Sequence, residues 1–178
     1  MSVTIPPHEI LIVDPTTGEG DWQTLRQQCY DVRIDVFHHE QGFPLETEID
    51  NLEDSSTHIL LRLVPSLKPV GTIRYTRFAK YSKLSRLAVL KEYRQFKFGR
   101  KLVEALNQHA IRDATKSLES GNNKTDATHV IRIVCHSQIP VKPFYAKFGY
   151  EPEGDEFDED GAPHQRMVAT LPLSQSQS

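Results

Sequence analysis

A short run of basic residues carries the clearest chemical signal in the chain. Arg94, Lys97, Arg100 and Lys101 surround Gly99 just before apolar residues at helical spacing. The first turn of a helix has backbone N–H groups without partners in the helix and carries partial positive charge, so it binds phosphate groups well. Gly99 lets a ligand approach the backbone because it has no Cβ. The run predicts a pyrophosphate cradle, although an ordinary basic helix start on the surface would have the same composition.

The residues on either side of this run predict the elements that position it. Leu87–Leu90 is an apolar run with the length of a short strand. Beyond the run, Leu102, Val103, Leu106 and Ala110 recur three or four residues apart, as on one face of a helix. The sequence therefore predicts a strand, a basic loop and a long helix, with the loop amides directed at one spot.

The spacing resembles the acyl-CoA-binding motif of the GCN5-related N-acetyltransferase (GNAT) superfamily. That motif reads Arg or Gln, two residues, Gly, one residue, Gly or Ala, usually after a strand reading Leu-Ala-Val. Arg94 takes its first position and Gly99 its last, while Lys97 stands at the middle glycine. We expect Lys97 to have a negative φ and to add its charge to the phosphates.

The resemblance implies that acetyl-CoA is the cosubstrate. The pyrophosphate would lie on the amides of Lys97–Lys101, and the pantetheine arm would pair with the backbone of Leu87 and Val89 like an added strand. The cofactor-binding residues expected from the motif are Leu87, Ala88, Val89, Arg94, Gln95, Phe96, Lys97, Phe98, Gly99, Arg100 and Lys101.

The order of predicted elements also resembles the GNAT fold, of α/β (α+β) class, with a mixed central sheet flanked by helices. We expect a single acyltransferase domain over residues 1–173, a polar connector at 117–127 and a disordered tail at 174–178. Asp21 would cap the first helix. The expected strands cover residues 10–13, 59–64, 70–78, 87–90 and 130–135 and a hairpin from 150, and the expected helices cover 21–37, 102 to about 116, and 141–148.

A second resemblance points to the ElaA/YjcF-like branch of the superfamily. Most members of this branch are predicted acyltransferases, so the resemblance implies the chemistry better than the substrate. It rests on Arg33-x-x-Val36-Phe37-x-x-Glu40-Gln41, the acidic run to Asp50, His58, Glu156-Phe157, and Asp160-Gly161-x-Pro163-His164-x-x-Met167.

Acetyl transfer to an amine needs a proton donor for the departing thiolate. Pro143–Tyr150 matches the family's aromatic-Tyr-x-x-x-Gly-aromatic element, whose tyrosine usually lies beside the CoA sulfur. The resemblance therefore implies that Tyr145 is the general acid, and a phenol with a pKa near 10 is protonated at neutral pH. The alternative is that Tyr145 is a packing aromatic.

The transfer also needs an amine without its proton and a base that takes the proton up. Glu40, His58, His136 and His164 are the candidates. His164, on the last strand, would be the base or an acceptor ligand, and Glu40 ends the first helix near the expected acceptor mouth. His136 follows the strand at 130–135 together with Gln138, and these two would alternatively orient the cofactor arm.

Arg33 and Arg74 are further candidates for the acceptor side, because guanidinium binds carboxylate or phosphate through two hydrogen bonds. Alternatively, Arg33 pairs with the acidic loop. That loop would be a solvated surface segment or would attract a cationic amine. Its spacing does not match a calcium loop, and we expect no metal. Its acidic residues are Glu46, Glu48, Asp50, Glu53 and Asp54.

Composition limits the remaining functions. The chain has 178 residues, 38% hydrophobic and 25% charged, and a net charge of −3, which argues against a general nucleic-acid binder. Cys29 and Cys135 are too few for a disulfide framework, and we expect both to be buried thiols. No apolar run has the length of a membrane span and the start does not read as a signal peptide, so we expect a cytoplasmic protein without a membrane partner.

The first hypothesis is an N-acyltransferase that moves acetyl from acetyl-CoA to a primary amine of a small molecule by direct attack. An amino-sugar phosphate, as in glucosamine-6-phosphate acetyltransferases, is the leading named acceptor. The competing hypothesis is a non-catalytic acyl-CoA-binding protein. A nucleotide-phosphate binder is weaker, since Gly-x-x-x-x-Gly-Lys-Ser/Thr is absent. The oligomeric state stays open, with a homodimer as one alternative.

Overall fold

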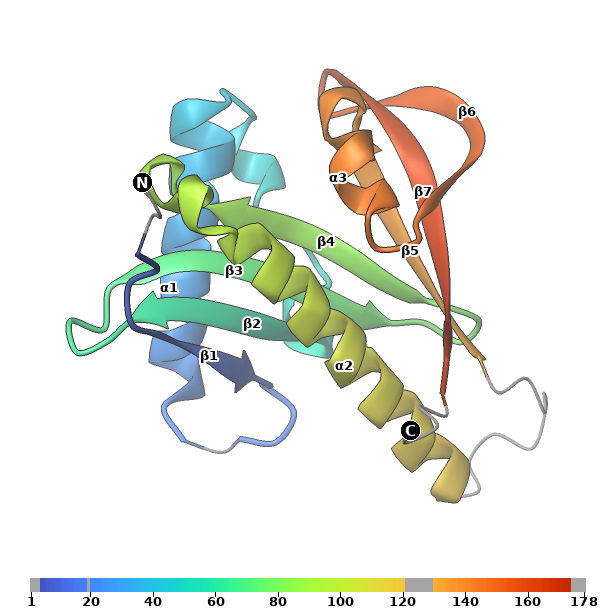
Figure 1. Ribbon diagram of the computed structural model, residues 1–178, viewed down its shortest axis with the longest axis horizontal. Helices are drawn as coiled ribbons and strands as arrows, with labels where there is room; N and C mark the ends of the chain where they lie inside the picture. Colours follow the sequence, from blue (N-terminus) through green and yellow to red (C-terminus); the bar gives the residue numbers. More distant parts are fainter. Residues whose placement is uncertain (1–3, 19, 121–129, 174–178) are drawn as a thin grey trace. The chain divides into compact units, whose positions relative to one another are not determined.

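The computed structural model describes residues 4–18, 20–120 and 130–173 (Figure 1). Within them, seven strands are hydrogen-bonded in the order β1-β2-β3-β4-β5-β7-β6. β4 and β5 are parallel, whereas the pairs β1-β2, β2-β3, β5-β7 and β6-β7 are antiparallel, so the mixed sheet predicted from the sequence is confirmed. The strands are β1 His8–Val13, β2 Ser56–Leu63, β3 Pro69–Arg77, β4 Ser82–Val89, β5 Val130–Gln138, β6 Glu151–Glu159 and β7 Ala162–Pro172.

The helices agree with the expected order and differ at their ends. They are α1 Trp22–Arg33, α2 Phe98–Glu119 and α3 Lys142–Ala146, with a π-helical segment at Ile34–Glu40 and 3-10 turns at Leu45–Thr47, Glu53–Ser55, Lys91–Phe96 and Ile139–Val141. The predicted connector at 117–127 is wrong for Ser117–Glu119, which continue α2. The rest of it from residue 121 and the predicted tail at 174–178 lie outside the described residues.

The described chain divides into two compact units, each with its own contacts. The first holds the residues up to Thr76 and Ser85–Leu106, and the second holds Arg77–Leu84 and the residues from Asn107 onward. β4 and α2 contribute to both units. The single acyltransferase domain over residues 1–173 remains a prediction.

In the first unit, α1 packs against β1 and β2 through its apolar face. Cys29 lies in a cluster with Val13 and Leu60, all buried, and Val32 lies in a second cluster with Ala88. These α1 positions are spaced three residues apart, as expected for one face of a helix. Asp21 is the N-cap residue, as predicted, and its carbonyl accepts from the amide of Leu25 at 3.1 Å, but its side chain makes no capping hydrogen bond in the described part of the chain.

The π-helical segment carries the helix three residues beyond its predicted end at Phe37, to Glu40. The amide of Gln41 donates to the carbonyl of Val36 at 3.1 Å, five residues back, as in a π-helix. A π-helical turn adds a residue per turn and turns the following side chains to a new direction. It places Glu40 at the end of this segment, where the side chain reaches residues distant in the sequence.

The first turns of α2 pack closely against β3. A Cβ on Gly71 of β3 would lie 3.0 Å from Cδ1 of Leu102, tighter than most Cβ contacts, so a larger residue there would require the Leu102 side chain to shift. Leu102, Val103 and Leu106 are fully buried, as the helical spacing predicts.

In the second unit, β5 presents two different faces. Ile131, Ile133, Cys135 and Ser137 alternate along the strand and are all buried. α3 packs against β5 and β7. The residues between them, including His136, point to the opposite face. Cys29 and Cys135 are both buried and unpaired, as expected.

Candidate active site

The basic loop folds as a 3-10 turn that runs into α2. Lys91–Phe96 form this turn, and Lys97 joins it to the helix with φ 58° and ψ 28°, a left-handed conformation. The predicted negative φ of Lys97 is therefore wrong. The family's middle glycine suits a left-handed residue at this point, and here a lysine takes the same conformation at a steric cost of about 1–2 kcal/mol.

The amides available for an anion are fewer than predicted. Those of Lys97 and Lys101 donate to the carbonyls of Arg94 and Lys97, both at 3.3 Å. The helix begins at Phe98, so the amides of Phe98, Gly99 and Arg100 belong to its first turn, where N–H groups have no partner within the helix. This leaves a cradle of successive amides at the start of a long helix.

Aromatic packing holds this helix start in place. The ring of Phe98 is fully buried and lies 4.8 Å from the ring of His8 and 5.7 Å from that of Phe96. The charges face outward: Arg100 is exposed and pairs with Glu104 at 2.7 Å, one turn along α2. The cradle thus has a rigid apolar base and a basic rim.

Arg94, the first residue of the motif, is held by two partners. Its Nε donates to the carbonyl of Val89 at 3.0 Å, and its two terminal nitrogens donate to both carboxylate oxygens of Glu40 at 2.7 and 2.6 Å. The hydrogen bond from Arg94 lowers the pKa of Glu40, which makes this carboxylate a weaker base than an ordinary glutamate. The carbonyl of Val89, expected to meet the pantetheine arm, already accepts one hydrogen bond.

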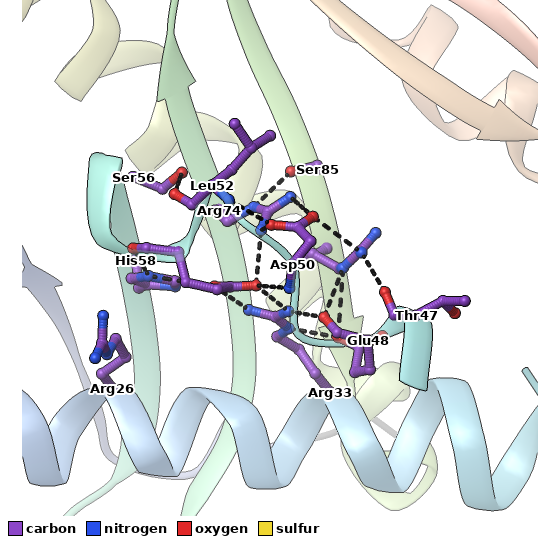
Figure 2. A network of polar contacts seen from close by, with 12 residues as sticks. Arg26, Arg33, Thr47, Glu48, Asp50, Leu52, Ser56, His58, Arg74 and Ser85 are labelled. Atoms are coloured by element: carbon purple, nitrogen blue, oxygen red, sulfur yellow. Dashed lines mark hydrogen bonds and ion pairs between the residues drawn. The ribbon is translucent and has the colours of Figure 1, made fainter. Parts of the chain in front are cut away.

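Arg33 and Arg74 lie in a buried ionic network (Figure 2). Arg33 donates to Glu48 at 2.5 Å and to Glu53 at 3.0 and 2.8 Å. Arg74 donates to Asp50 at 2.8 and 2.9 Å and to Glu53 at 2.8 Å. Both guanidinium groups are thus paired within the chain, the arrangement given as the alternative for Arg33.

Most of the acidic residues in the loop at 46–54 belong to this ionic network. Glu48 and Glu53 are buried and Asp50 is half-buried, so the expectation of a solvated loop is wrong for these three carboxylates, while Glu46 and Asp54 are exposed as expected. Because their charges are compensated by arginines from α1, β3 and β4, the loop has little negative charge left to attract a cationic acceptor.

Arg86 of β4 completes the network and was not singled out from the sequence. Its guanidinium donates to the carbonyl of Thr47 at 2.9 Å and to Asp50 at 3.3 Å. Its φ of 54° interrupts the regular strand. The residue type alone carries no signal for a left-handed conformation in a strand.

His58 lies within the same buried cluster. Its Nε2 is 3.2 Å from the carbonyl of Glu53, and its ring is fully buried. Burial lowers the pKa of His58 to about 4, so the ring is neutral at physiological pH. With no exposed surface, this candidate base has no access to an acceptor in the described structure.

Tyr145 of α3 is buried among aromatic rings in the second unit. Its ring lies 5.3 Å from that of Phe144 and 5.7 Å from that of Tyr150. Burial raises the pKa of Tyr145 above its ordinary value, so the hydroxyl keeps its proton at neutral pH. This is the state a proton donor needs, and it is equally the state of a packing tyrosine.

His136 and His164 share one face of the second unit with Glu159. Nδ1 of His136 is 2.8 Å from Oε1 of Glu159, and Nε2 of His164 is 3.8 Å from Oε2 of the same carboxylate. Nδ1 of His164 is 2.9 Å from the carbonyl of Ala162. The ring of Phe157 contacts both imidazoles. Two histidines predicted separately are thus joined by an acidic residue that the prediction missed.

A sequence signal for Glu159 existed in the closing hairpin. Asp160 and Gly161 both have positive φ, 54° and 81°, as in the two-residue turns favoured by Asp-Gly. Such a turn fixes the register, which pairs Glu159 with Ala162 and Phe157 with His164. Counting back from the turn would have placed Glu159 on the face of His164.

Comparison with known proteins decides the family. The profile described as the acetyltransferase (GNAT) domain matches residues 25–171. This chain belongs to the GNAT family. The uncharacterized N-acetyltransferase YjcF of Bacillus subtilis strain 168 is 32% identical over 143 residues, which are 80% of this GNAT chain and 90% of YjcF.

Solved GNAT-type structures share the fold of this chain. Escherichia coli ElaA has a TM-score of 0.65 at 21% identity, with 91% of this chain and 99% of that chain covered. An acyl-CoA N-acyltransferase from Pseudomonas aeruginosa has a TM-score of 0.71 at 17% identity, with 91% and 99% covered. The resemblance to the ElaA/YjcF-like proteins is therefore confirmed, and this GNAT protein is an N-acyltransferase that uses an acyl-CoA cosubstrate.

The last two observations concern metal binding and membrane-spanning helices. Within residues 4–18, 20–120 and 130–173, no group of three or more His, Cys, Asp or Glu side chains is placed to hold a metal ion. Of the helices in the described chain, none is long and apolar enough to cross a membrane.

Proposed function

We propose that this GNAT protein transfers acetyl from acetyl-CoA to a primary amine of a small molecule by direct attack. The observation that carries this proposal is the cradle of Phe98–Arg100 amides, which the chain enters through Lys97 in a left-handed conformation that a glycine would adopt without strain. An anion held there is the pyrophosphate of CoA, and the basic side chains of the loop add charge to its rim.

Direct attack is supported by the state of the cysteines. Burial raises the pKa of Cys29 and Cys135 to about 12, so neither is a thiolate at neutral pH. Because the thiolate is the nucleophilic form, an acyl-cysteine intermediate is disfavoured. The amine nitrogen then attacks the thioester carbon, the C–S bond breaks, and the sulfur takes a proton from the hydroxyl of Tyr145.

A cationic amine is the acceptor class we propose. Arg33 and Arg74 are both neutralised by carboxylates, which leaves neither for a phosphate on the acceptor and weakens the amino-sugar phosphate alternative. Strand β6 instead has exposed acidic residues, which attract cations. They are Glu151, Asp155, Glu156 and Asp158.

A reducing compartment suits the two unpaired thiols, and we propose the cytoplasm as the location. The experiment that tests the function is a panel of primary amines with acetyl-CoA, read as release of the CoA thiol. We expect polyamines and other cationic amines to give the highest rates, decreasing with salt. Thiol release that no amine stimulates would favour the non-catalytic acyl-CoA-binding alternative.

A further inference from the structure

The polar face of the second unit is built by four strands. Cross-strand pairing sets His136 against Arg166 and Gln138 against His164, and β6 adds Glu159 beside Ala162. Lys83 of β4 pairs with Val134, which alternation puts on this same face, and it acts electrostatically on Glu159. The opposite face of β5 holds Cys135, which interacts with Tyr145. This polar face and the aromatic packing of Tyr145 under α3 therefore lie on the two sides of the same strand, β5.

The hydrogen bonds on this face determine which nitrogens carry protons. The hydrogen bond from His136 lowers the pKa of Glu159, so the carboxylate is ionised and can only accept. Nδ1 of His136 must therefore donate, which leaves Nε2 of the neutral ring with a free lone pair. The T-shaped contact with Phe157 at 5.0 Å holds the ring plane.

His164 has a different arrangement. A backbone carbonyl can only accept, so Nδ1 of His164 donates to Ala162 and the second nitrogen faces Glu159 at 3.8 Å. Its side chain is 7% exposed, whereas that of His136 is 27% exposed. Both nitrogens of His164 thus point at groups of the hairpin. Of these two histidines, only His136 combines an oriented tautomer with access from outside.

We infer that His136, oriented by Glu159, is the base that takes the proton from the acceptor amine, and that Glu159 is its positioning residue. This inference rests on the proposed function. Nε2 of His136 takes a proton from the protonated amine, and the freed nitrogen then forms its bond to the thioester carbon. The C–S electron pair goes to sulfur, which is protonated by Tyr145. The Tyr145 phenolate takes up the remaining excess proton of the nitrogen, and His136 releases its proton to solvent.

Two acceptors of different basicity test this inference. 1,4-Diaminobutane is protonated at pH 7 and must lose a proton before it attacks, whereas hydroxylamine is mostly neutral and attacks without this first deprotonation. We expect His136→Gln to lower acetyl transfer to diaminobutane by about 10²- to 10⁴-fold and to hydroxylamine by less than about 10-fold. Arg132→Gln, on the same face of β5 and paired with Glu153, is the matched control and should leave both rates near wild type.

The pH profile tests the role of Glu159. In wild type, transfer to diaminobutane should rise through a limb that His136→Gln removes. Glu159→Gln should retain the limb and reduce the rate, because a neutral amide accepts the Nδ1 hydrogen bond more weakly and orients the ring less firmly. Calorimetric affinity for CoA should stay unchanged in both variants. An equal loss with both acceptors, or a limb that survives in His136→Gln, would overturn the assignment.

Nitrogen-15 NMR of the histidine ring separates failure of this inference from failure of the proposed function. If wild type acetylates neither amine, the proposed function fails, and the ring tautomer of His136 then tests the His136–Glu159 pair by itself. A neutral His136 that carries its proton on Nδ1 in wild type, but no longer does so in Glu159→Gln, supports the pair. A neutral ring protonated on Nε2 in wild type overturns it.

Discussion

Glu40 and Arg94 form an ion pair with two hydrogen bonds, 2.7 and 2.6 Å long, across 54 residues of sequence. Arg94 lies in the basic 3-10 turn before α2, and Glu40 ends the π-helical segment. The pair makes Glu40 a partner of Arg94 and a poor base, because a carboxylate whose pKa is lowered by a guanidinium holds protons poorly.

Glu40→Gln should therefore strengthen the binding of CoA. A carboxylate competes with phosphate for Arg94 and repels it, and an exposed pair of this kind is worth about 1 kcal/mol or less. We expect an affinity gain of up to about fivefold by calorimetry, with the pH dependence of turnover unchanged. Loss of the rising limb of the pH–rate profile in this variant would restore Glu40 as the base.

Two substitutions at Lys97 separate backbone strain from charge. Glycine has no penalty at φ 58°, but it costs about 0.5–1 kcal/mol of chain entropy, so Lys97→Gly should gain up to about 1 kcal/mol in unfolding free energy. Lys97→Ala keeps the strain and should be close to neutral. Both lose the same charge, so their CoA affinities should fall equally. If urea titrations find the glycine variant less stable than the alanine variant, the left-handed conformation of residue 97 is not strained.

The hydroxyl of Tyr145 should matter for turnover, and the neighbouring tyrosine provides a control. Tyr145→Phe should lower turnover about 10- to 1,000-fold while leaving CoA affinity nearly unchanged. The hydroxyl of Tyr150 is buried without a hydrogen-bond partner among the described residues, so Tyr150→Phe should keep turnover and gain about 1 kcal/mol in stability. Wild-type rates in Tyr145→Phe would make this residue a packing aromatic.

Breaking the buried network should cost far more than breaking a surface pair. Glu53→Gln leaves Arg33 and Arg74 without a shared carboxylate, and we expect a loss of about 3–5 kcal/mol in unfolding free energy. Asp54→Asn removes an adjacent carboxylate that is 90% exposed and pairs with Arg26, and should cost about 1 kcal/mol or less. Similar losses for the two variants in denaturant titrations would contradict the burial of the network.

Acid should destabilise the chain in two pH windows. The pKa of His58 is lowered from 6.5 to about 4 by burial, so its contribution is complete above pH 6.5 and is lost as pH falls toward 4, on the order of 3 kcal/mol. Hydrogen bonds from Arg74 lower the pKa of Asp50 to about 2, so that contribution is lost between about pH 4 and 2. The unfolding free energy of His58→Gln should therefore not fall between pH 6.5 and 4. A loss of stability in this range that persists in His58→Gln would contradict the assignment to His58.

The elements of the fold were predictable from local patterns. Apolar spacing gave the core face of α2 through Leu102 and Leu106, and strand-length apolar runs marked β2, β3 and β5. The family motif located Arg94 and Gly99 at the start of that helix. These features depend on residues close together in the chain, so a single sequence contains them.

The contacts that define the site depend on distant residues and could not be read in this way. Arg33 pairs with Glu53, and His136 with Glu159, twenty or more residues away. A charged side chain indicates its partner only when the register of the intervening elements is known. The left-handed Lys97 was missed for another reason: lysine has no preference for that conformation, and packing imposes it.

Mass spectrometry of the acceptor after incubation with acetyl-CoA labelled in its acetyl group tests acetyl transfer most simply. A cationic primary amine should gain one labelled acetyl group, in proportion to free CoA, at a rate lowered strongly by Tyr145→Phe and by His136→Gln. An acceptor panel that stays unlabelled while CoA binds tightly to the chain would contradict acetyl transfer to small amines.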